Sequence, residues 1–335
     1  MIIPPVIPFR EGLVEAALRP IPGGVEVLVR LADGDGGAVP VACHPALAGE
    51  VARGDRVVVG ALPPGDLPQA EPRRVIVAAA RGPHGRLAAV PSAGLAGLPV
   101  ACLPMGAMLP AAAAGASAAG AEHVVWVTPA ADPDGLDLVA GPLVEGGLLA
   151  AVAVAEPERC CAALLGAQGD GADVVLVADA PGAPAAGGAR AGAAQLAPAL
   201  WTVAAAALGG RPVAGLPLGA APWDAGTPLP RGTLDALAEI VPEGTHVAVP
   251  SLEEGPERAA LWAALVDAGL HVRHQLVDVT GEPAARLVAA RGLVPPSGTR
   301  DPSLLAAGAA GVLGGRMAAR DRFWRRDSAG RARQG

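Results

Sequence analysis

Residues 173–192 read DVVLVADAPGAPAAGGARAG, and this stretch decides the fold class. Residues 173–178 form a short, Val-rich run of the kind found in strands that are buried on both faces. A glycine-rich loop follows, and the Ala/Leu-rich residues 192–208 predict a helix. A buried strand that leads through a loop into a helix is the repeating unit of a parallel α/β sheet.

The same alternation extends from about residue 84 towards the C-terminus. Further buried strands are expected at residues 99–103, 123–128, 149–154, 212–216, 245–249 and 271–279. Further helices are expected near residues 106–120, 157–167, 231–240, 254–268, 282–291 and 302–320. The sequence therefore predicts an α/β domain with a mostly parallel, doubly wound (Rossmann-like) sheet that helices cover on both faces.

The N-terminal part has a different rhythm. Short strands are expected at residues 13–18, 25–31, 39–43, 56–59 and 73–80, with turns such as Pro22-Gly23-Gly24 between them. Several short strands in so little chain predict a small β-barrel or a partly open sheet. The predicted organisation is a small β domain at residues 1–80, the α/β domain at 81–320 and a tail at 321–335. The tail region from Arg316 carries seven Arg and two Asp and is expected to be disordered, with binding of an anionic partner as the alternative.

The composition excludes some classes of function. The net charge is −7 and aromatic residues make up 2% of the chain, so neither broad nucleic-acid binding nor a base-stacking surface is expected. The uncharged run at residues 87–121 is interrupted by proline and dominated by Ala and Gly, so it predicts no membrane span. Lys and Asn are absent and all 25 basic residues are Arg, which indicates a GC-rich bacterial genome.

The four cysteines indicate a reducing compartment. Cys43, Cys102, Cys160 and Cys161 form no C-x-x-C pair, and two of them are adjacent, which suits neither a disulfide framework nor a metal site. Residues 1–10 lack a basic segment followed by an apolar one, so no signal peptide is expected. We therefore expect buried free thiols and a cytoplasmic location.

Ligands of such sheets bind beyond the carboxyl ends of the strands. The position of a polar residue relative to those ends therefore indicates whether it can contact a ligand. His123, His246 and His271 stand near the beginnings of predicted strands, while His274 falls in mid-strand. His44 and His84 belong to the β part or the junction. No imidazole is therefore expected at the ligand-binding edge, so a general base of the usual kind is missing there.

Few polar residues remain at that edge: Thr128, Glu156, Asp179, Asp224 and Ser251. Asp179 and Glu156 are the candidates for acid/base or metal-ligand roles, although a helix cap suits Asp179 better. Ser251 lacks the G-x-S-x-G context of a hydrolase nucleophile. Asp132 and Asp134 form an Asp-Pro-Asp-Gly sequence, which is foremost a turn.

The best candidate for ligand binding is the glycine-rich loop, with Gly182, Gly187, Gly188 and Gly192. A strand that leads into such a loop and then a helix presents backbone N–H groups to a phosphate. The loop matches neither G-x-G-x-x-G nor G-x-x-x-x-G-K-[ST], so a plain surface loop is the alternative.

Several short segments, taken in order, span almost the whole chain. They are Phe9–Gly12, His44–Gly49, Gly54–Val57, Gly82–Leu87, Asp173–Asp179, Leu208–Val213, Thr233–Leu237 and Thr245–Pro250. Their succession resembles one uncharacterised bacterial family, catalogued as domain of unknown function 3866. The resemblance implies an N-terminal β region and an α/β domain, and it brings no established activity.

The chain departs from that family's polar motifs. Pro104-Met105-Gly106 stands where a His-Ser-Gln is expected, residues 155–159 replace a Gly-His motif, and Arg231-Gly232 replaces a His-His pair. We therefore expect a divergent, non-catalytic or weakly active protein that binds a small anionic or nucleotide-like ligand. The alternatives are an enzyme acting on a phosphorylated or nucleotide substrate and a scaffold for a protein partner. The sequence indicates no particular cofactor and leaves self-association open.

Overall fold

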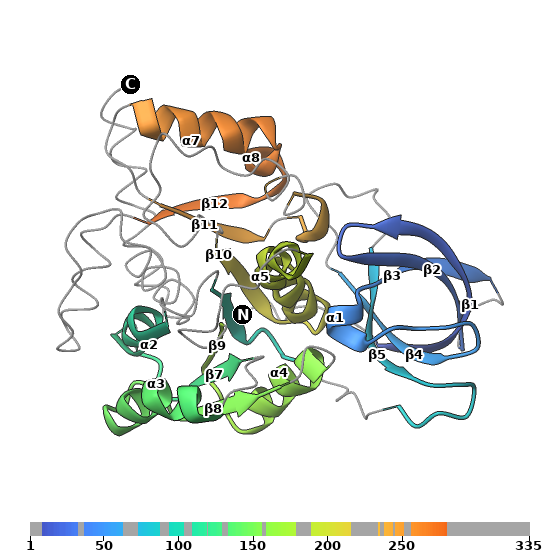
Figure 1. Cartoon of the computed structure of the whole chain (residues 1–335), viewed down its shortest axis with the longest axis horizontal. Helices are drawn as coiled ribbons and strands as arrows, with labels where there is room; N and C mark the ends of the chain where they lie inside the picture. The colour runs from blue at the N-terminus through green and yellow to red at the C-terminus, as the bar shows by residue number, and fades with distance from the viewer. Residues whose placement is uncertain are drawn as a thin grey trace.

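The computed structural model describes most of the chain up to residue 279 (Figure 1). The described residues are 9–32, 37–62, 73–87, 94–103, 109–118, 120–128, 133–155, 159–178, 189–215, 234, 238–243, 245–250 and 256–279. The helices expected at 282–291 and 302–320 and the basic tail lie outside them. Among the described residues, no helix is long and apolar enough to cross a membrane.

The N-terminal strands form a closed barrel, which confirms the predicted β region. The strands are β1 (Arg10–Ile21), β2 (Gly24–Leu31), β3 (Ala38–Cys43), β4 (Arg56–Ala61) and β5 (Arg74–Ala80), in the order β1-β2-β3-β5-β4. β1 and β2 are joined by Pro22 and Gly23, and the φ of +70° at Gly23 is one that glycine adopts without strain. Pairing of β1 with β4 closes the barrel.

The barrel has a small apolar core of its own. Val27, Val29 and Leu31 point inward from β2 in the alternating pattern that the sequence predicts. On β4, Val57 and Val59 face the barrel interior, while Val58 belongs to the larger core shared with the rest of the molecule. The two faces of β4 therefore serve two different cores.

The second part of the chain builds a seven-stranded parallel sheet, as predicted. Its strands are β6 (Pro99–Cys102), β7 (Val124–Thr128), β8 (Ala151–Val154), β9 (Val174–Val177), β10 (Arg211–Gly215), β11 (His246–Pro250) and β12 (Gln275–Val279). Their order in the sheet is β12-β11-β10-β6-β9-β7-β8, and all pairs are parallel. β6 and β9 are buried along their whole length, since they lie in the middle of the sheet.

Helices pack around this sheet. They are α2 (Leu109–Ala118), α3 (Pro133–Glu145), α4 (Cys160–Gly169), α5 (Ala189–Ala207), α7 (Pro256–Asp267) and α8 (Leu270–Arg273), while α1 (Pro45–Ala48) belongs to the barrel. α5 packs against β6 and β10, and α2 packs against β7 and β9.

Two sequence predictions were wrong in this region. Asp134 lies in α3, although the Asp-Pro-Asp-Gly sequence predicted a turn, because Pro133 suits the first position of a helix. The predicted strand 271–279 is split: His271 lies in α8, and His274 precedes β12 instead of lying within a strand. A short apolar run does not distinguish a helical turn from a strand by periodicity alone.

The barrel packs against the α/β part through α1, which lies between the barrel and α5 (Figure 1). α1 contacts both α4 and α5, and a single buried core includes Leu47 of α1, Val77 of β5 and Ala204 of α5. The approach is close at Gly60, where a Cβ atom would lie 2.8 Å from the carbonyl oxygen of Ala207. The division at residue 80 stays a prediction.

Candidate functional site

The strand order singles out one position on the sheet. From β6 the chain passes through α2 to β7, on the far side of β9; from β9 it passes through α5 to β10, on the far side of β6. The crossovers from these two neighbouring strands therefore lead to opposite sides of the sheet order. In open parallel sheets, such a reversal at the carboxyl ends is where ligands bind.

The described framework of this edge is buried and joined by hydrogen bonds. The N–H of Leu103 donates to the carbonyl oxygen of Val177 at 2.8 Å, which joins the ends of β6 and β9. The indole N–H of Trp126, a fully buried side chain on β7, donates to the carbonyl oxygen of Ala178 at 3.0 Å. Binding groups at this edge must therefore come from the loops and their backbone.

Some of the sequence-predicted site residues lie within the described part of the chain, and the others lie outside it. Gly192 lies in the first turn of α5 and not in the loop, because α5 begins at Ala189, earlier than predicted. Thr128 ends β7 at the expected edge and is fully buried. The remaining candidates lie outside the described residues: Glu156, Asp179, Gly182, Gly187, Gly188, Asp224 and Ser251.

All six histidines lie in the part of the chain that the structure describes, and none lies at the carboxyl edge of the parallel sheet. His123 directly precedes β7 and His246 begins β11, so both lie at the amino edge, as predicted. His274 lies at that same edge, because the register pairs His246 with the next residue, Gln275. The prediction of a ligand edge without an imidazole is confirmed.

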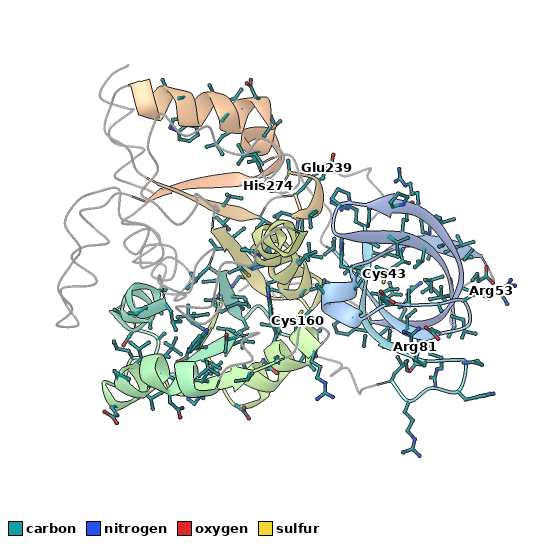
Figure 2. The ribbon with its side chains drawn as sticks, in the orientation of Figure 1. Cys43, Arg53, Arg81, Cys160, Glu239 and His274 are labelled. Atoms are coloured by element: carbon teal, nitrogen blue, oxygen red, sulfur yellow. The ribbon has the colours of Figure 1, made fainter. Side chains whose placement is uncertain are left out.

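The cysteines are buried in the interior of the protein. All four are free and buried, as predicted, with Cys43 in the barrel and Cys160 at the start of α4 (Figure 2). Burial raises the pKa of Cys43 to about 11 and that of Cys102 to about 12. Burial, reinforced by the adjacent Cys161, also raises the pKa of Cys160 well above its ordinary value. The raised pKa values favour the protonated form of these three thiols at neutral pH, in which a thiol is a poor nucleophile.

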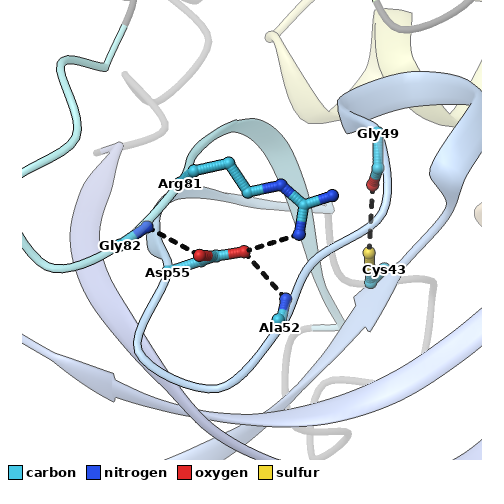
Figure 3. Close-up of polar contacts among 6 residues, drawn as sticks. All are labelled: Cys43, Gly49, Ala52, Asp55, Arg81 and Gly82. Atoms are coloured by element: carbon cyan, nitrogen blue, oxygen red, sulfur yellow. Dashed lines mark hydrogen bonds and ion pairs between the residues drawn. The ribbon is translucent and has the colours of Figure 1, made fainter.

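A second polar feature, which the sequence did not predict, lies on the barrel (Figure 3). Asp55 is 4% exposed, and its carboxylate accepts the N–H of Ala52 at 2.8 Å and that of Gly82 at 2.7 Å. Arg81 approaches the same carboxylate at 3.5 Å. Burial alone would raise the pKa of Asp55, but the hydrogen bonds from Gly82 and Ala52 and the charge of Arg81 outweigh it and hold the pKa below its ordinary value.

The neighbouring Arg56 ties together other segments of the barrel. Its guanidinium donates to the Glu11 carboxylate at 2.5 Å and to the carbonyl oxygen of Gly85 at 3.2 Å. Residues 9–12, 54–57 and 82–87, which carry part of the family resemblance, therefore meet on one side of the barrel. Contacts of Glu11, Asp55 and Arg56 join these segments. No local signal in the sequence relates segments so far apart.

A pocket of about 540 Å³ adjoins Asp55, between α1 and the end of β5. Its lining includes Glu50, Asp55 and Arg81. It lies in the barrel and not at the carboxyl edge of the sheet, so the protein has two separate candidate sites.

Comparisons with protein-family models, curated proteins and solved structures find no match to this chain. The resemblance to the uncharacterised bacterial family therefore stays a prediction. The interpretation of both sites rests on their geometry.

Proposed function

We propose that the protein binds a small anionic, nucleotide-like ligand at the carboxyl edge between β6 and β9. The observation that carries this proposal is the reversal of chain direction at these two strands. Parallel crossovers are almost always right-handed, so crossovers that run in opposite directions put α2 and α5 on opposite faces of a doubly wound, Rossmann-like sheet. Crossovers that leave two neighbouring strands towards opposite faces favour a crevice for the ligand at their carboxyl ends.

The sequence at this edge suits an anion. β9 is followed by the glycine-rich residues 179–188, and α5 begins directly afterwards at Ala189. Glycines allow close approach of backbone N–H groups to a phosphate, and the N-terminus of a helix carries partial positive charge. Neither feature needs a basic side chain.

The absence of ordinary catalytic groups supports binding over catalysis. None of the six histidines reaches this edge, and Cys102, at the end of β6, is held as a neutral thiol. The alternative, an enzyme acting on a phosphorylated or nucleotide substrate, would depend on Asp179 and Glu156.

The binding proposal is tested by thermal shift of the full chain with inorganic phosphate, mononucleotides, dinucleotides and sugar phosphates, each with and without Mg²⁺. A ligand at about 100 times its Kd stabilises the folded state by about 2.7 kcal/mol. The double variant Gly187→Asp/Gly188→Asp, which adds two negative charges to the loop, is expected to lose this stabilisation.

The matched control is Gly166→Asp/Gly169→Asp in α4. Both glycines are exposed, and a Cβ atom at either would meet no neighbouring atom. These residues lie at the end of α4 that leads to the amino end of β9, on the opposite edge of the sheet. The control is expected to keep the ligand-induced shift. No shift with any ligand, or equal loss in both variants, would contradict the proposal.

The catalytic alternative has its own test. If the bound ligand is turned over and Asp179→Ala abolishes turnover without loss of folding, the protein is an enzyme. Unchanged turnover in that variant would remove Asp179 from consideration.

A further inference from the structure

The barrel is closed between β3 and β5 by a short stretch of pairing, and the pocket beside Asp55 lies next to it. In the described part of the barrel, β3 pairs with β5 at a single position, Ala42 with Val75. β3 ends at Cys43, and Pro45, which has no N–H, begins α1. Beyond Val75, β5 therefore has α1 beside it instead of a strand.

The walls of this pocket are small and apolar. Pro45, Ala46 and Ala48 line it from α1, and Ala79 and Ala80 line it from β5. Ala79 and Ala80 are partly exposed in the pocket, and β3 does not pair with this part of β5. A strand edge without a neighbouring strand offers N–H and C=O groups to an extended peptide.

The pocket also carries charges of both signs. The Arg81 side chain is 71% exposed, and its contact with Asp55 uses one N–H group, so the rest of the guanidinium fork can bind a carboxylate. Asp55 is itself buried and held by two backbone N–H groups, which makes it a fixed anchor for Arg81 (Figure 3). The exposed Glu50 adds a second carboxylate, so negative charge is in excess and a phosphate is disfavoured.

We propose that this pocket binds a short zwitterionic peptide of small apolar residues, with its carboxylate on Arg81 and its ammonium group near Glu50. The volume of about 540 Å³ is in the range of small-molecule sites and exceeds what a single amino acid needs. The end of β5 that does not pair with β3 suits an extended backbone, and the alanine-lined walls suit small side chains. Each feature of the pocket thus corresponds to one part of the ligand.

The test is isothermal titration calorimetry of the full chain with trialanine. Trialanine amide and N-acetyl-trialanine, each of which lacks one terminal charge, are expected to bind at least about tenfold more weakly. This comparison uses the unaltered protein and so does not depend on the folding of a variant. No binding of trialanine at about 10 mM, or equal binding of the three peptides, would overturn the proposal.

Variants then assign the two charges. Arg81→Gln and Glu50→Gln are each expected to weaken trialanine binding by about tenfold or more. Arg86→Gln removes a positive charge from an exposed position on the same turn, outside the pocket lining, and is expected to leave binding within about twofold. Equal effects of Arg81→Gln and Arg86→Gln would exclude a specific carboxylate site. Gly187→Asp/Gly188→Asp alters no residue of the pocket and is expected to keep trialanine binding. The proposals for the two sites can therefore be refuted independently of each other.

Discussion

Replacement of Asp55 by alanine measures how much the buried carboxylate contributes to the barrel. Hydrogen bonds to a charged acceptor contribute about 1.5–3 kcal/mol each. The hydrogen bond from Gly82, at 2.7 Å, is expected to contribute this whole amount. The hydrogen bond from Ala52 contributes less, because Ala52 is exposed and its N–H binds water in the variant. The exposed Arg81 adds less than about 1 kcal/mol. We therefore expect Asp55→Ala to lower the free energy of unfolding by about 2–4 kcal/mol, measured by urea denaturation.

The pH dependence of this difference has a definite sign. The pKa of Asp55 in the folded protein lies below its ordinary value of 3.8, so the carboxylate stabilises the fold above that pH. The stabilisation is lost as the pH falls through the folded-state pKa. The difference between the natural protein and Asp55→Ala is thus expected to be constant from about pH 5 to pH 7 and to shrink below about pH 4. A difference that stays constant or grows on acidification would refute the reasoning.

Asp173 provides the matched comparison. Its carboxylate also accepts two backbone N–H groups, those of Glu122 and His123, both at 2.9 Å, but it is exposed. Asp173→Ala is expected to cost about 1 kcal/mol or less, because water replaces the lost acceptor. An equal cost for both variants would show that burial of Asp55 is irrelevant.

Three further predictions concern packing and the thiols. Gly60→Ala should lower the free energy of unfolding by about 1–3 kcal/mol in denaturation experiments, since its Cβ would press on the carbonyl oxygen of Ala207. Gly166→Ala, in open space on α4, should be neutral or stabilising. The reverse order of stabilities would contradict the close packing of barrel and helix. Trp126→Phe, measured in the same way, should cost about 2–3 kcal/mol through the lost bond to Ala178 and the space left behind, and a cost near zero would argue against that contact. All four thiols should resist a thiol reagent at pH 8 until the protein unfolds, as followed by absorbance, because they are buried; fast labelling of the folded protein would contradict their burial.

The sequence predicted the kinds of elements better than their arrangement. The alternating Val residues of β2 and the buried run of β9 carry their own signal, because one face or both faces of a strand must be apolar. α3 was missed because Asp-Pro-Asp-Gly forms both turns and helix starts. α8 was missed because residues 270–279, in which apolar and polar residues are mixed, contain both a helical turn and a strand.

The candidate sites were predictable to different degrees. The positions of His123 and His246 at the amino edge followed from the strand assignments alone. The reversal of direction between β6 and β9 depends on strand order, which no local pattern encodes. The pocket beside Asp55 joins residues from three separate segments of the barrel, so only the folded chain brings them together.

The central claim is that an anionic ligand binds where the chain reverses direction in the sheet. Amide chemical-shift mapping by NMR, with a nucleotide titrated into the full chain, tests it most directly. The account predicts shifts concentrated at Leu103, Ala178 and the first turn of α5, next to the ends of β6 and β9. Shifts confined to the amino edge around His123 and His246, or to the barrel, would contradict it.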